Sequence, residues 1–236
     1  MAQAYFITGT DTDAGKTNIA AGLLCAAQQQ QHSTLAMKPV ASGCEVRAEG
    51  LQNSDALALM AQSSIKRPYA EVNPYAFAPA IAPHIAAQEA GVALQVSDLY
   101  QAAQVILQQQ ADFTLIEGAG GWRVPLSETA FLSDFAKTLK LPVILVVGVK
   151  LGCINHALLT AQAIQSDGLE LAGWIANVVD PNCARLEENL VTLKQQMPAP
   201  CLAQVPHLTH TGAEHVAEFL QHGVAQLSKS RKTSYF

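Results

Sequence analysis

The stretch Gly9-Thr10-Asp11-Thr12-Asp13-Ala14-Gly15-Lys16-Thr17 has the layout of a phosphate-binding loop. The apolar run Tyr5-Phe6-Ile7 leads into it, and an Ala- and Leu-rich segment that begins at Lys16 follows it. Backbone N–H groups of such a loop and the dipole of the following helix bind a phosphate. The sequence therefore predicts a nucleotide site in which Lys16 reaches the β- and γ-phosphates and the Thr17 hydroxyl faces Mg²⁺.

The loop differs from the standard pattern at one position. The standard loop has a Gly four residues before the Gly-Lys pair, whereas this chain has Thr10 there and Gly9 one place earlier. The competing interpretation is a strand-turn-helix unit with a surface lysine. The order of strand, loop and helix favours the phosphate loop.

Composition points to a packed domain that is not specialised for nucleic acid. The chain has 236 residues, of which 50% are apolar and 14% charged, and its net charge is −5. These values predict one α/β domain that spans residues 1–227, and a disordered polar tail that spans residues 228–236. Five cysteines without a C-x-x-C pair, no signal-like N-terminus and no long apolar span indicate a reducing cytoplasm and no membrane partner.

Strand-like and helix-like segments alternate along the whole chain. Strands are expected at 35–40, 113–117, 142–149, 172–179 and 201–205, after the first strand at the phosphate loop. Helices are expected at 53–63, from an N-cap at Ser97 to about residue 111, at 131–140, 155–166 and 184–196, and from about residue 212. The proline-rich stretch 67–83 is expected to be an ordered excursion. This alternation predicts a doubly wound α/β fold with a mainly parallel sheet and helices on both faces.

Chemically distinctive residues are expected at the carboxyl ends of the strands, where ligands bind in such sheets. Lys38 and Ser42 follow the second strand, Glu117 ends the third and Asn177 the fifth. Because burying an unpaired charge is costly, Lys38 is interpreted as an anion-binding residue rather than a solvated lysine. Glu117 is the expected Mg²⁺ partner of the phosphate loop, with a loop-capping carboxylate as its alternative. Spacing alone leaves Asp55 open between metal binding and a helix-dipole role.

Six segments in series resemble one enzyme family. They are GTDTDAGKT (9–17), KPVASG (38–43), NSDALAL (53–59), EGAGGW (117–122), VVGVKLGCINH (146–156) and AGWIAN (172–177). In this order, and over most of the chain to about residue 208, they resemble dethiobiotin synthetase, a family of P-loop enzymes.

The resemblance implies an activity and a set of site residues. The expected reaction is the ring closure of 7,8-diaminopelargonic acid (7,8-diaminononanoate) with CO₂ and ATP, with Mg²⁺ as cofactor, through a carbamate and a carbamic–phosphoric anhydride in a homodimer. Lys16 and Lys38 are the expected catalytic cations, and a Lys38→Ala variant is expected to fold normally and lose most turnover. The resemblance further implies nucleotide and metal contacts from Asp13, Ala14, Gly15, Lys16, Thr17, Asp55, Glu117, Gly118, Ala119, Gly120, Asn177, Pro206, His207 and Leu208, with Thr17, Asp55 and Glu117 on the metal. It implies substrate contacts from Thr12, Lys38, Ser42, Gly152, Cys153, Ile154 and Asn155, the last four reaching a neighbouring subunit's substrate.

Four positions depart from the family pattern. Val178 and His207 stand where an acidic residue and a Trp are expected, and Glu214 is only a loose match to an acidic ribose contact. Asp11 replaces the signature lysine of some relatives of this fold, so Lys16 and Lys38 must supply the charge. The alternative function is a P-loop ATPase switch that recruits a partner. A GTPase is a second alternative, but the lysine that its base-reading motif requires after Asn177 is absent.

Overall fold

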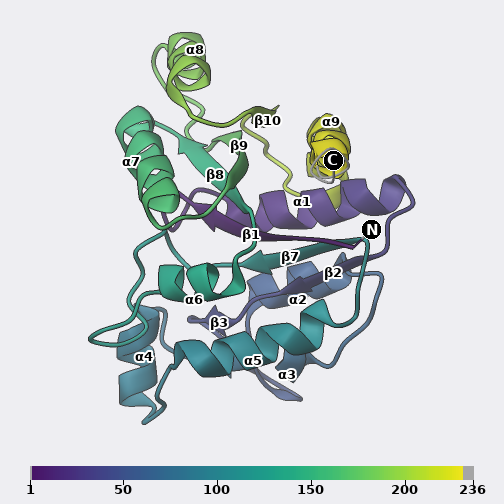
Figure 1. Ribbon diagram of the computed structural model, residues 1–236, viewed down its shortest axis with the longest axis vertical. Helices are drawn as coiled ribbons and strands as arrows, with labels where there is room; N and C mark the ends of the chain where they lie inside the picture. Colours follow the sequence, from purple (N-terminus) through teal and green to yellow (C-terminus); the bar gives the residue numbers. More distant parts are fainter. Residues whose placement is uncertain (1, 231–236) are drawn as a thin grey trace.

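A computed structural model describes residues 2–230, which form a six-stranded sheet between two layers of helices (Figure 1). All neighbouring strands are parallel. The predicted doubly wound α/β fold is thus confirmed. In spatial order the strands are β10 (Cys201–Val205), β9 (Leu171–Val178), β8 (Val143–Val149), β1 (Gln3–Gly9), β7 (Phe113–Glu117) and β2 (Thr34–Met37).

Each face of the sheet packs against its own set of helices. Side chains of successive strand residues point to opposite faces, so Tyr5 and Ile7 of β1 join one core and Phe6 joins the other. Figure 1 shows α1 on one side of β1 and α6 on the other. The first core includes α1 (Lys16–Gln29), α2 (Ser54–Ala61) and α9 (Ala213–Ser230), and the second includes α5 (Val96–Leu107), α6 (Leu132–Leu139), α7 (Cys153–Ser166) and α8 (Leu186–Gln196).

The connections reverse direction at β1. From β1 the chain passes through α1 to β2 at one edge of the sheet, whereas from β7 it passes through α6 to β8 on the other side of β1. In open parallel sheets such a reversal leaves a crevice outside the carboxyl ends of the strands. The phosphate loop follows β1 and Glu117 ends β7, so both lie at this crevice.

The chain between β2 and β7 makes a long structured excursion. It contains β3 (Val40–Ala41), β4 (Glu45–Arg47), β5 (Gly50–Gln52), α3 (Tyr69–Val72), β6 (Tyr75–Ala76) and α4 (Pro83–Glu89), in addition to α2 and α5. Strand β3 pairs in parallel with β6, which ties the segment after β2 to the proline-rich stretch. The prediction that 67–83 is ordered is confirmed, whereas the hairpin β4–β5 and helix α4 were not predicted.

Two details of the sequence prediction are wrong. Gln95, not Ser97, precedes the first residue of α5, and the Ser97 hydroxyl instead donates to Asp98. Helix α9 continues to Ser230, so residues 228–230 are helical rather than a disordered tail; residues 231–236 lie outside the described part of the chain. The end of α9 is held because the Tyr5 hydroxyl donates to the Leu227 carbonyl at 3.1 Å. Among the described residues, no helix is both long and apolar enough to cross a bilayer.

Candidate functional site: a phosphate loop beside a buried Lys-Glu pair

The phosphate loop turns at Gly15, which has a φ of 82° and caps the N-terminus of α1. Glycine is favoured in this left-handed conformation because it has no Cβ. A Cβ at this position would lie 2.2 Å from Nδ2 of Asn177. The same Nδ2 donates to the Ala14 carbonyl at 2.9 Å, so the end of β9 fixes the loop's backbone.

Lys16 is folded back onto the loop. Its ammonium donates to the carbonyls of Asp11, at 2.9 Å, and Thr12, at 3.1 Å. Burial, and after it the positive charge of Lys38, lower the pKa of Lys16 to about 8, against the opposing effect of nearby carboxylates. Within residues 2–230 no carboxylate forms an ion pair with Lys16, and a bound phosphate would supply that anion.

A buried Lys-Glu pair lies beside the loop, where β2 and β7 end. Glu117 is 0% exposed, and its Oε1 accepts from the Thr17 hydroxyl at 2.8 Å and from the Lys38 ammonium at 2.5 Å. Lys38 also reaches Oδ2 of Asp55 at 3.1 Å. Burial alone would lower the pKa of Lys38, but the charges and hydrogen bonds of Glu117 and Asp55 raise it above its usual value.

The pair shows which groups neutralise the buried Lys38 ammonium in the ligand-free protein. Lys38 was expected to bind an anion because burial demands a partner, and in this structure the partners are carboxylates of the chain itself. Of the three expected metal ligands, Asp55 and Glu117 contact the Lys38 ammonium, and Thr17 donates to the same oxygen of Glu117 that Lys38 contacts.

These residues fit a hard divalent cation. Two carboxylates and a hydroxyl offer oxygen ligands, which Mg²⁺ prefers, and in phosphate sites the remaining positions go to phosphates and water. Glu117 Oε2 is buried and has no hydrogen-bond partner among the described residues. No set of three or more His, Cys, Asp and Glu side chains suited to a metal occurs in residues 2–230, so a cation here would need the nucleotide's oxygens as well.

A cleft of about 840 Å³ opens over the loop and the Lys-Glu pair, and we call it the main cleft. The phosphate loop and residues that follow β2 and β3 supply polar lining, and Ile81, Pro83 at the start of α4, and Val124 and Pro125 before α6 supply apolar lining. The expected site residues that line it are Thr12, Asp13, Gly15, Lys16, Thr17, Lys38, Ser42, Asp55, Ala119 and Gly120. Ser42 Oγ is buried without a hydrogen-bond partner among the described atoms, so it can accept one from a ligand.

A second cavity of about 210 Å³ lies on the other side of the phosphate loop. Asn177 from β9 and His207 and Leu208 after β10 line it together with Asp13 and Gly15. The structure thus brings together Asn177, His207 and Leu208, three residues that the resemblance assigned to the nucleotide. Because these residues and the phosphate loop line the same cavity, a nucleotide could place its base against the former and its phosphates against the latter.

Several expected site residues line neither cavity. Ala14 and Gly118 are buried behind the loops, Pro206 is exposed next to the second cavity, and Glu214 is exposed on α9. Gly152, Cys153, Ile154 and Asn155 form the start of α7, outside both cavities. Leu151, just before them, is 95% exposed.

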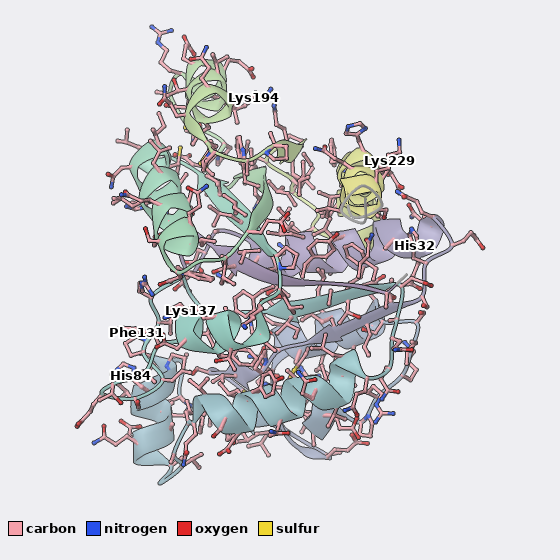
Figure 2. The ribbon with its side chains drawn as sticks, viewed as in Figure 1. His32, His84, Phe131, Lys137, Lys194 and Lys229 are labelled. Atoms are coloured by element: carbon pink, nitrogen blue, oxygen red, sulfur yellow. The ribbon has the colours of Figure 1, made fainter. Side chains whose placement is uncertain are left out.

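Asp11 is paired within its own chain. Its Oδ2 lies 3.1 Å from Nδ1 of His156 and 3.8 Å from Nζ of Lys150, both from the region where α7 begins. The carboxylate at the position of the signature lysine is therefore held by Lys150 and His156 of the same chain. Three other lysines, labelled in Figure 2, lie apart on the outer surfaces of α6, α8 and α9 and do not gather into one basic face.

Three polar side chains at the cavities were not predicted from the sequence, namely Arg123, Asn18 and Asn53, the last of which lines the main cleft. Arg123 lines the main cleft and also pairs with Asp167 at 2.8 Å. Asn18, in the first turn of α1, lines both cavities. Arg123 directly follows the glycine-rich segment 118–122, and this position in the sequence could have identified it as a residue of the cleft.

The parallel sheet, the phosphate loop and the adjoining acidic residues define a P-loop nucleotide-binding protein. A protein-family model described as AAA domain matches residues 3–215. The chain is 62% identical over 217 residues to ATP-dependent dethiobiotin synthetase BioD of Pseudomonas aeruginosa (strain UCBPP-PA14), covering 92% of this chain and 95% of that protein. It is 55% identical to ATP-dependent dethiobiotin synthetase BioD of Cellvibrio japonicus (strain Ueda107), with the same coverage. This chain belongs to the ATP-dependent dethiobiotin synthetase family.

Solved structures similar to this one agree on the fold. The septum site-determining protein MinD of Pyrococcus horikoshii OT3, complexed with Mg-ADP, has a TM-score of 0.61 at 15% identity, and 98% of each chain is covered. MinD in the MinC:MinD complex of Aquifex aeolicus has a TM-score of 0.60 at 10% identity, covering 100% of this chain and 98% of that one. At these identities the likeness concerns the architecture alone.

Proposed function

We propose that this chain closes 7,8-diaminopelargonic acid and CO₂ into the cyclic urea dethiobiotin, with conversion of ATP to ADP and phosphate, as a ligase of biotin biosynthesis. One observation carries the proposal. The main cleft joins the phosphate loop to Lys38 and Ser42, in a chain that is 62% identical to a named dethiobiotin synthetase. The cleft can therefore hold a phosphoryl donor and a second small molecule side by side.

The reaction needs positive charge at each stage. One amine of the substrate adds to CO₂ and loses a proton to give a carbamate. A carbamate oxygen attacks the γ-phosphorus, which displaces ADP and forms the carbamic–phosphoric anhydride. The second amine attacks the carbamoyl carbon, closes the ring, expels phosphate and loses its proton. Phosphoryl transfer depends mainly on positioning and on stabilising charge in the transition state.

The side chains of the cleft suit these steps. Lys16 lies on the phosphate loop and would bind the β- and γ-phosphates once it leaves the Asp11 and Thr12 carbonyls. Lys38 lies between the expected metal ligands and Ser42, where it would bind the carbamate and the transferring phosphoryl group. Thr17, Asp55 and Glu117 would hold Mg²⁺, which when bound neutralises charge on the phosphate oxygens.

The nucleoside would occupy the second cavity, with Asn177, His207 and Leu208 around the base. His207 offers ring nitrogens for hydrogen bonding in place of the Trp expected from the family. The cavity shares Asp13, Gly15 and Asn18 with the main cleft, so one nucleotide could span both.

We also propose that a homodimer in a reducing cytoplasm is the working form. Leu151 is 95% exposed beside the start of α7, at residues 152–155, which are assigned to a neighbouring subunit's substrate. Contact with a second copy would remove this apolar side chain from water. The five cysteines are all unpaired, in agreement with a reducing compartment.

One assay separates the proposed ligase from a nucleotide switch and from a GTPase. The protein is incubated with diaminopelargonic acid, bicarbonate, Mg²⁺ and either ATP or GTP, and nucleotide hydrolysis and the cyclic urea are followed by mass spectrometry. We expect hydrolysis that depends on the diamine and forms urea in equal amount. A rate of ATP hydrolysis that does not change when the diamine is added would favour the nucleotide switch. A requirement for GTP would favour the GTPase.

A further inference from the structure

A continuous set of hydrogen bonds runs from Asn53, which lines the main cleft, through the excursion between β2 and β7. Its central member is the Tyr69 hydroxyl on α3, which donates to Oδ1 of Asn73 at 2.7 Å and accepts from the backbone N–H of Asn53 at 2.7 Å. Asn53 and Asn73 are 5% and 2% exposed. We call Asn53, Tyr69 and Asn73 the polar relay; none of them was singled out from the sequence.

One end of the polar relay holds the backbone of Lys38. Nδ2 of Asn73 donates to the Lys38 carbonyl at 2.7 Å, and the Lys38 N–H donates to the Val72 carbonyl at 2.8 Å. Both polar groups of this residue's backbone therefore bind the segment 72–73. Lys38 follows the last residue of β2, so these bonds fix its backbone where the sheet no longer does.

The other end holds two further residues of the cleft. Oδ1 of Asn53 accepts from the Asp55 N–H at 3.0 Å and so caps α2, while Nδ2 of Asn53 donates to the Ser42 carbonyl at 3.2 Å. Asp55 and Ser42 come from separate segments, and Asn53 is bonded to both. The hydroxyl of Tyr69 joins this end to the Lys38 end.

Every donor in the polar relay has an acceptor in a consistent direction. The Asn53 N–H donates to Tyr69, Tyr69 donates to Asn73, and Asn73 donates to the Lys38 carbonyl. Tyr69 is partly buried, and the groups that its hydroxyl joins belong to the buried residues Asn53 and Asn73. Losing one partner of a buried polar group leaves that group unsatisfied at a cost of about 1–3 kcal/mol. Asn73 and Tyr69 are themselves fixed by the bond from the Asn73 N–H to the Tyr69 carbonyl at 2.7 Å.

We infer that Asn53, Tyr69 and Asn73 are positioning residues that hold Lys38, Ser42 and Asp55 in one catalytic geometry. The inference rests on the proposed function, because it assigns the three held residues to the carbamate, the substrate and the metal. None of the three relay residues lines the second cavity, so nucleotide binding there is independent of the polar relay. Misplacing catalytic groups by about 1 Å can cost on the order of a hundredfold in rate.

The test removes a single oxygen atom. Tyr69→Phe keeps the ring and deletes the hydroxyl that joins the two ends of the polar relay. Tyr5→Phe is the matched control, because Tyr5 is buried and its hydroxyl donates to Leu227 at the opposite end of β1 from the site. Both variants are assayed well below their melting temperatures for kcat, for the Mg²⁺ concentration at half-maximal rate and for the Kd of ADP without Mg²⁺. Asn73→Ala, which releases the Lys38 carbonyl, is a second test variant.

For Tyr69→Phe we expect kcat to fall at least about tenfold and the half-maximal Mg²⁺ concentration to rise several-fold, with the Kd of ADP unchanged. Tyr5→Phe should lose thermal stability but keep the wild-type kcat. The inference is overturned if Tyr69→Phe and Asn73→Ala keep kcat, if both control and test variants lose rate in parallel with stability, or if Tyr69→Phe does not fold. An inactive wild-type protein would instead overturn the proposed function.

Discussion

Replacing Lys38 by Met should destabilise the ligand-free protein as well as stop catalysis. The Lys38 ammonium lies 2.5 Å from a carboxylate that is fully buried, and Lys38 itself is 4% exposed. Met keeps most of the side-chain volume but leaves the charge of Glu117 without its cation. Breaking a buried ion pair by removing one partner costs about 3–5 kcal/mol. The expectation from the sequence that Lys38→Ala folds normally stays a prediction, and the melting temperature of a Lys38 variant tests it.

The loss can be measured as a shift in melting temperature. For a chain of this size about 1 kcal/mol corresponds to 2–4 °C, so Lys38→Met should melt roughly 6–20 °C below the wild type. Lys137→Met is the matched control, since Lys137 pairs with Asp134 on the outside of α6 (Figure 2). Exposed pairs contribute at most about 1 kcal/mol, and the control should melt within a few degrees of the wild type.

Two further measurements complete this test. Mg²⁺ can replace the missing positive charge, so it should raise the melting temperature of Lys38→Met more than that of the wild type. Turnover of the variant should fall on the order of 10²–10³, by analogy with removal of one donor from an oxyanion hole. If Lys38→Met and Lys137→Met melt at the same temperature, the buried pair does not stabilise the fold and the reasoning is refuted.

Three other perturbations have defined outcomes. Gly15→Ala places a methyl group against Asn177 and imposes a left-handed conformation that costs about 1–2 kcal/mol, so ADP affinity measured by calorimetry should fall about tenfold or more. Free Lys16 has a pKa of about 8, and a bound phosphate raises that pKa. Above pH 8 the binding of ADP therefore takes up a proton. The affinity for ADP should be constant below pH 8 and weaken by up to about tenfold per pH unit above it. Asp167→Ala leaves the buried Nε1 of Trp122 unpaired and should lower stability in a denaturant titration by about 1–3 kcal/mol. An unchanged ADP affinity, a flat pH profile or an unchanged denaturant midpoint would contradict these three predictions in turn.

The sequence was informative where structure follows from local pattern. Val143–Val149 of β8 is a continuous apolar run because both faces of a central parallel strand are buried, and the prediction of a strand there needed no tertiary information. The phosphate loop likewise carries its own glycine and lysine within a few residues. Strand β7 ends at Glu117 as expected, so the acidic residue beside the loop was found from the order of elements alone.

The sequence was silent where a residue's role depends on distant partners. Asp11 is paired with His156, 145 positions along the chain, and nothing near Asp11 indicates that contact. Tyr69 and Asn73 lie in a proline-rich stretch whose local pattern predicts only order, and their link to Lys38 exists because β6 pairs with β3. Ser97 was assigned as a helix cap from residue type, but α5 begins at Val96.

The packing of α9 against α1 has a consequence for how the chain is made. Helix α1, which carries the phosphate loop at its start, buries Ile19, Leu23 and Leu24 in a core completed by residues such as Leu220 of α9. The ribosome makes α1 near the beginning of the chain and α9 near the end, and at about 5–20 residues per second the interval is on the order of tens of seconds. During that time the part of α1 that packs against α9 has no native cover, although the strands and α2 can already cover the rest. We expect nascent chains stalled before α9 to stay sensitive to protease and to bind chaperones, and to become resistant only after α9 has emerged.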